Sequence, residues 1–116
     1  MGKLTTHVLD TARGRPAAGL DVQLFRLEAT GWELVAEDTT NQDGRLAAPL
    51  AEGADFAPGE YELLFHVGAW LERAGFDLPQ PKFLDIVPVR FGVSEDGHYH
   101  VPLLISPYGY ATYRGS

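Results

Sequence analysis

Apolar and polar residues alternate along most of this chain with a period of two. In residues 4–10, LTTHVLD, the side chains of Leu4 and Val8 share one face of an extended chain, and those of Thr5 and His7 share the other. Because successive side chains of a β-strand point to opposite faces, this alternation predicts a strand with one buried face. The same pattern predicts further strands at residues 20–27, 32–40, 60–67 and 84–93.

Turn-forming residues separate these strands. Asp-Gly within residues 41–44, NQDG, tolerates the positive φ that tight turns require. Loops are expected at residues 11–19, 52–59 and 95–97, and irregular extended chain at 76–83. Residues 69–74 form the only helix-like segment, which Gly75 ends. Pro88 confines the strand at 84–93 to an edge or a bulge, because proline cannot donate to a strand ladder.

The last nineteen residues, HYHVPLLISPYGYATYRGS, carry an unusual amount of polar chemistry. The pattern predicts a strand around Val101 and Ile105, a turn at Ser106-Pro107, and a returning strand at residues 108–113. His98 and His100 share a face of the first strand, about 6.5–7 Å apart. The hairpin would thus present two imidazoles, several tyrosines, one guanidinium and the terminal carboxylate.

Seven or eight short strands and one short helix favour a single all-β domain spanning residues 1–116, folded as an antiparallel β-sandwich. The net charge is −7 and the 9 basic residues are scattered, which argues against binding to nucleic acid or anionic lipid. No apolar run approaches the roughly 20 residues of a membrane span. The first residues do not resemble a signal peptide, so we expect a cytoplasmic protein.

Four histidines are the main candidates for chemistry, and each is first expected to be a surface or core residue. His66 keeps that interpretation, whereas His98 and His100 gain weight from their shared face. His-x-His with a third histidine is one way to bind zinc, so a zinc site is an alternative. Without cysteine or a G-x-S-x-G segment, the usual cysteine and serine nucleophiles are not indicated. Arg45 is either solvated or holds a planar ligand that bears carbonyl groups.

Five segments, read in order, resemble 5-hydroxyisourate hydrolases, the transthyretin-related enzymes of urate breakdown. They are LTTHVLD at 4–10, QDGR at 42–45, PVRF at 88–91, HYHVPLL at 98–104 and YRGS at 113–116. The resemblance implies a transthyretin-like sandwich of two four-stranded sheets with one short helix. It also implies a homotetramer, a dimer of dimers with a central channel, whose active sites lie where subunits meet.

The same resemblance implies hydrolytic opening of 5-hydroxyisourate to 2-oxo-4-hydroxy-4-carboxy-5-ureidoimidazoline, without a metal or an organic cofactor. By motif, His7, Arg45 and His100 occupy the catalytic positions, and which histidine is the base stays open. The YRGS segment implies substrate contacts from Tyr113, Arg114 and Ser116, together with His7 and Arg45. His98 is expected to be a supporting residue.

Two other functions remain as alternatives. Transthyretin uses the same sandwich to carry a small aromatic hormone, and fold alone cannot separate a carrier from an enzyme. The combination of His7, Arg45, His100 and YRGS favours the enzyme. A zinc-dependent hydrolase is the second alternative, which full activity after chelation would dismiss.

Overall fold

A computed structural model describes residues 2–116 as two packed β-sheets with one short α-helix. The first sheet is antiparallel throughout, in the order β5-β4-β7-β8. Each of its four strands begins and ends within two residues of the strand that the alternation predicts. The bounds are β5 (Gly31–Thr39), β4 (Asp21–Glu28), β7 (Gly59–His66) and β8 (Ile86–Val93). The strand with Pro88 lies at the edge of this sheet, as expected.

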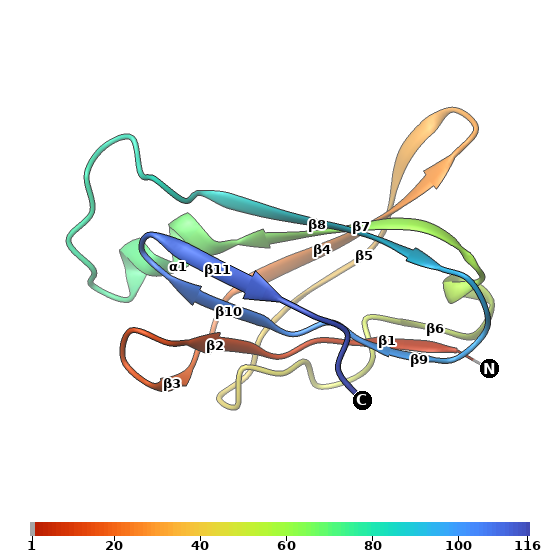
Figure 1. Cartoon of the computed structure of the whole chain (residues 1–116), viewed down its shortest axis with the longest axis horizontal. Coiled ribbons are helices and arrows are strands. Elements are labelled where there is room, and N and C mark those ends of the chain that lie inside the picture. Colours follow the sequence, from red (N-terminus) through yellow and green to blue (C-terminus); the bar gives the residue numbers. More distant parts are fainter. Residues whose placement is uncertain (1) are drawn as a thin grey trace.

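The second sheet is built from both ends of the chain, which lie side by side along its length (Figure 1). Its strand pairing divides into a three-stranded part, β6-β1-β9, and a four-stranded part, β11-β10-β2-β3, which follow one another along the layer. The N-terminal segment supplies β1 (Lys3–Thr5) and β2 (Val8–Asp10), and the C-terminal segment supplies β9 (His98–His100), β10 (Leu103–Ser106) and β11 (Gly109–Thr112). The short strands β3 (Arg15–Pro16) and β6 (Ala51–Glu52) flank them.

The pairing of these two segments is parallel, which differs from the antiparallel expectation for this sheet. Both segments are interrupted, between β1 and β2 and between β9 and β10. Thr5 pairs with His100 before this break and Val8 with Leu103 after it, so the strand register is the same on both sides. Main-chain hydrogen bonds cross the break, from Val101 N to the Thr5 oxygen at 3.0 Å and from Leu103 N to the His7 oxygen at 2.9 Å. The strands predicted at residues 4–10 and around residues 101–105 are therefore each interrupted, but their pairing continues beyond the interruption. Pro102 contributes to the interruption because it has no N–H to donate.

Side chains from the inner faces of both sheets form the core. Leu4 and Val8 of the second sheet are fully buried, whereas Thr5 and His7 are only half-buried on its outer face. On the first sheet, alternate residues of β7 point inward in the same way, and His66 points outward. The two faces predicted from the alternation are therefore confirmed.

Helix α1 (Val67–Arg73) begins two residues before the predicted start and is followed by Gly75 at φ +87°. Its Trp70 donates from Nε1 to the main-chain oxygen of Ala18 at 2.7 Å, which fixes the helix against the loop before β4. Two predicted loops contain more structure than expected. Residues 11–19 include β3, and residues 52–59 include the 3₁₀ turn η1 (Gly53–Phe56) and the end of β6. Such two-residue pairings depend on a partner strand and leave no alternation in the sequence.

No helix within residues 2–116 is long and apolar enough to cross a membrane.

Replacing a core leucine with alanine should destabilise the fold far more than the same change at the surface. Leu63 on β7 is fully buried, whereas Leu34 on β5 is 51% exposed. We expect Leu63→Ala to lower the free energy of unfolding by about 2–5 kcal/mol, because it leaves a cavity, and Leu34→Ala by less than about 1 kcal/mol. Urea denaturation at one fixed protomer concentration measures both. Equal losses would show that the core is misidentified.

Candidate active site

Three segments that are distant in sequence meet on the outer face of the second sheet. His7 lies at the junction of β1 and β2, and His100 lies beside Thr5 on the neighbouring strand β9. Arg45 pairs with His7 through an isolated antiparallel bridge of the main chain. The structure thus brings together His7, Arg45 and His100, the three residues predicted from the motif resemblance to be catalytic.

The turn at residues 41–44 holds Arg45 in place. The side-chain oxygen of Asn41 accepts hydrogen bonds from the main-chain N–H groups of Asp43 and Arg45, at 2.9 and 3.2 Å. Gly44 is buried with φ +74°, and its oxygen accepts from Val8 N at 2.8 Å. A Cβ at Gly44 would run into the main-chain oxygen of Val8. Only glycine therefore lets this turn dock so closely against the junction of β1 and β2.

The ring of His7 is oriented by the same turn. Its Nε2 lies 2.8 Å from the main-chain oxygen of Asp43. A carbonyl oxygen can only accept, so Nε2 carries the proton and donates it. In the neutral ring, Nδ1 is then the atom with a free lone pair.

Two neighbours hold His100 in place, one at its ring and one at its main chain. The Oγ1 atom of Thr5 lies 2.8 Å from Nδ1 of His100 and also 2.8 Å from Nε2 of His98. On the other side, Gly115 N donates to the His100 oxygen at 2.7 Å, so the C-terminal tail crosses the strand there. A Cβ at Gly115 would lie only 2.6 Å from Cδ2 of His100, which explains why glycine is needed in the tail. Nε2 is the ring nitrogen of His100 that these contacts leave available.

Burial lowers the pKa of His100 below the ordinary histidine value, and the charge of Arg45 lowers it further, as His98 and His7 do when they are protonated. Each of these influences disfavours a second positive charge in the cluster. His100 is therefore a neutral imidazole near neutral pH. A neutral ring with an available Nε2 can accept a proton.

The guanidinium of Arg45 is exposed beside these rings. Within residues 2–116 it makes no hydrogen bond or salt bridge to another side chain. Its five N–H donors are thus available to a planar acceptor, and the cation would stabilise negative charge that develops on a carbonyl oxygen.

The rest of the YRGS segment lies partly elsewhere. The Arg114 guanidinium stacks on the ring of the buried Tyr99, 3.9 Å from its centroid, and contacts the main-chain oxygen of His98 at 3.3 Å. Arg114 and Tyr113 line a cavity of about 300 Å³, together with residues of β8 such as Phe91. Ser116 is exposed at the chain end. Substrate contacts from Tyr113, Arg114 and Ser116 therefore remain a prediction.

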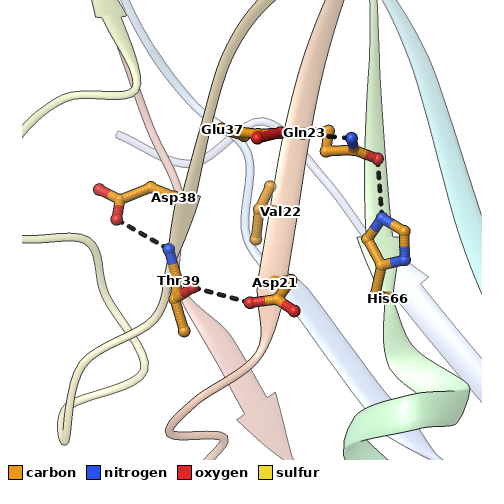
Figure 2. A pocket seen from close by; sticks show the side chains of 7 residues that line it. All are labelled: Asp21, Val22, Gln23, Glu37, Asp38, Thr39 and His66. Carbon is orange, nitrogen blue, oxygen red and sulfur yellow. Dashed lines mark hydrogen bonds between the residues drawn. The ribbon is translucent and has the colours of Figure 1, made fainter.

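A larger hollow, of about 490 Å³, lies away from this cluster on the first sheet (Figure 2). There His66 contacts the side-chain oxygen of Gln23 at 2.7 Å, and the Gln23 amide reaches Glu37 at 3.5 Å. Thr39 donates to Asp21 at 2.7 Å. His66 is thus satisfied within a polar surface network, consistent with its interpretation as a residue outside the site.

Within residues 2–116, no group of three or more His, Cys, Asp or Glu side chains is arranged to hold a metal ion. The effect of a chelator on activity tests the zinc alternative.

Two residues of the cluster were not singled out from the sequence. Thr5 lies on the same strand face as His7, but its contacts depend on the parallel register with β9. Gly115 belongs to the YRGS segment, yet its role depends on where the tail crosses His100. Neither feature leaves a signal in local sequence.

Removing the charge of Arg45 should raise the pKa of His100. In Arg45→Gln one of the nearby positive charges is lost, so protonation of His100 costs less, while burial keeps its pKa below the ordinary value. NMR titration of the imidazole measures the change, with the exposed Arg15→Gln on β3 as the control. An unchanged or lower His100 pKa in Arg45→Gln would show that the two groups are not coupled.

Comparison with known proteins identifies the family. A model described as the HIUase/Transthyretin family matches residues 4–115. 5-Hydroxyisourate hydrolase 2 of Rhizobium meliloti is 60% identical over 116 residues, which are 99% of this chain and 97% of that protein. The structure of Klebsiella pneumoniae 5-hydroxyisourate hydrolase is 40% identical, with a TM-score of 0.83 and full coverage of both chains. Transthyretin from Sparus aurata is 26% identical, with a TM-score of 0.88 over 99% of this chain and 97% of that one. The chain belongs to the HIUase/Transthyretin family.

Proposed function

We propose that this protein hydrolyses 5-hydroxyisourate, opening its six-membered ring to give 2-oxo-4-hydroxy-4-carboxy-5-ureidoimidazoline in urate breakdown. Relatives that match the full chain at high identity carry the name 5-hydroxyisourate hydrolase. Within the molecule, the proposal rests on the proximity of a neutral His100 to Arg45, whose guanidinium has no side-chain partner among residues 2–116.

The chemistry follows from the positions of these groups. His100 accepts a proton at Nε2 from a water molecule, and the water oxygen attacks the ring carbonyl of the substrate. Arg45 holds the carbonyl oxygen and stabilises the negative charge that develops on it. As the ring C–N bond breaks, the departing nitrogen takes a proton either from His100, which has received one from water, or from His7 if His7 enters the step as an imidazolium.

Transport of a small aromatic ligand is the second candidate function. The likeness to Sparus aurata transthyretin favours it at the level of fold. A carrier needs a ligand surface but no proton acceptor. The cluster of His7, Arg45 and His100 therefore favours hydrolysis over transport.

We also propose a homotetramer whose sites lie at subunit interfaces. Strands β8 and β11 are edges of their sheets, so their outer main-chain groups can pair with another copy. Large apolar side chains are exposed near these edges, including Tyr110, at 47%, and Phe83, at 69%. The open surface around His100 also needs a second protomer to enclose a substrate. The cytoplasmic location remains a prediction.

The direct test generates 5-hydroxyisourate in place with urate oxidase and follows its ultraviolet absorbance with and without the protein. Faster decay with the protein supports the hydrolase, and the spontaneous rate in its presence would defeat it. A chelator in the same assay decides the zinc alternative: an unchanged rate dismisses it.

In the same assay, His100→Ala and Arg45→Ala should each lower turnover by roughly 10²-fold or more, because each removes a group that acts in the transition state. His66→Ala is the matched histidine control and should leave turnover near the wild-type value. Near wild-type turnover in either site variant would remove that residue from the mechanism.

The tetramer predicts a particular response to charge at the sheet edge. Light scattering should give about four times the 12.7 kDa chain mass for the wild type. Tyr110→Lys should lower the mass, because a buried lysine opposes edge pairing. Leu34→Lys, at a similarly exposed apolar residue on β5, should not. A monomeric wild type would contradict the assembly.

A further inference from the structure

The hydroxyl of Thr5 touches both histidines of strand β9. Its Oγ1 lies 2.8 Å from Nε2 of His98 and 2.8 Å from Nδ1 of His100. The parallel register produces this placement, because it sets Thr5 beside His100 and Lys3 beside His98. The centroids of the two imidazole rings are 6.4 Å apart, which is too far for a direct hydrogen bond between their nitrogens. The Thr5 hydroxyl bridges the two rings.

A hydroxyl has one proton, so Thr5 must donate to one ring and accept from the other. When Nδ1 of His100 carries a proton, the Thr5 oxygen accepts a hydrogen bond from it, and the Thr5 hydroxyl donates to Nε2 of His98. Neutral His100 then has its lone pair on Nε2. When Nε2 of His98 carries a proton, Thr5 donates to Nδ1 of His100, and neutral His100 has its proton on Nε2. The tautomers of the two neutral rings therefore change together.

We propose that Thr5 is a positioning residue that couples His98 to His100 as a proton relay. His98 carries the positive charge of the proton taken from water, while His100 exchanges protons with water and the departing nitrogen. The inference rests on the proposed hydrolase function. It gives the supporting histidine, His98, a defined task.

The relay balances in protons and electrons. Water gives a proton to Nε2 of His100, the electron pair of that O–H bond forms the new C–O bond, and the π pair of the carbonyl moves onto its oxygen beside Arg45. His100 then passes its Nδ1 proton to Thr5, which passes its own proton to Nε2 of His98. His98 is now an imidazolium, and His100 is neutral with a proton on Nε2. The oxyanion pair then re-forms the C=O bond, the C–N pair leaves on the ring nitrogen, and that nitrogen takes the Nε2 proton of His100. The relay then runs backward and restores the starting state.

The surroundings favour this direction of transfer. His100 is half-buried and faces the charges of Arg45 and His7, whereas His98 is exposed to water that stabilises its charge. Lys3, the register partner of His98 on β1, and Arg114, which donates to the His98 main-chain oxygen, are cations that oppose a charge on His98. Their repulsion is screened by solvent because His98 is exposed, whereas the repulsion at the half-buried His100 is screened less. Moving the positive charge from His100 to His98 therefore moves it from a confined ring to a solvated one.

Activity tests the relay through three variants. Thr5→Val keeps the β-branched shape but removes the hydroxyl, and should lower kcat by roughly tenfold or more with little change in KM. Thr5→Ser restores the hydroxyl and should recover most of the loss. Thr39→Val removes a hydroxyl that bonds to Asp21 on the other sheet, and should leave kcat unchanged.

A double variant tests whether Thr5 and His98 act in the same relay. Because Thr5→Val and His98→Ala interrupt the same relay, the double variant should lose no more kcat than the more impaired single variant. Fully multiplicative losses, or wild-type kcat in folded Thr5→Val, would overturn the proposal. If Thr5→Val fails to fold, His98→Ala alone decides: it should lower kcat by a similar factor, and wild-type kcat would overturn the relay.

A readout independent of catalysis is the ¹⁵N NMR spectrum of histidine-labelled protein, which the four histidines keep simple. In the wild type, the tautomers of His98 and His100 should change together with pH, and in Thr5→Val they should change independently. Independent behaviour in the wild type would overturn the relay. Absence of any hydrolysis by the wild type would instead defeat the hydrolase function, so the two failures are distinguishable.

Discussion

The parallel pairing of the N-terminal segment with the C-terminal segment is the constraint on which the site depends. Residues 3–10 and 98–106 lie side by side in one register, held across their interruption by main-chain hydrogen bonds. The buried hydroxyl of Thr6 adds a further link, to the Val101 oxygen at 2.7 Å. This pairing places His7 and His100 on one face although more than ninety residues separate them.

The two short segments that complete the cluster depend on that pairing and on glycine. The turn before Arg45 docks through Gly44, and the tail crosses His100 through Gly115. Each contact is too close for a side chain. The result is a local excess of positive charge in a chain whose net charge is −7. Burial and nearby charge together favour the neutral form of His100, and the Arg45 guanidinium has no side-chain partner within residues 2–116. This arrangement suits a reaction that takes a proton from water and stabilises an oxyanion.

Much of the fold could be predicted from the sequence because the strands follow from the local alternation of apolar and polar residues. The alternation around Tyr61 and Leu63 specifies a strand and its buried face, and Pro88 specifies an edge. The parallel register could not be predicted, because strand pairing between distant segments leaves no periodic signal. The two-residue strands β3 and β6 were missed for the same reason.

The site shows the same division. Family motifs indicated His7, Arg45 and His100, and the fold brings these residues together. The bridging role of Thr5 depends on where a hydroxyl falls between two rings on another strand, which no motif specifies. Tyr113 and Arg114 border a different cavity of the single chain, so their contribution depends on how copies of the chain assemble.

The most direct measurement is a crystal structure of the assembled protein with a non-hydrolysable analogue of 5-hydroxyisourate. The account predicts that the planar ring lies against His7 and His100, with a carbonyl oxygen on the Arg45 guanidinium. An analogue seated instead in the polar hollow beside His66, with these three side chains far from it, would contradict the account.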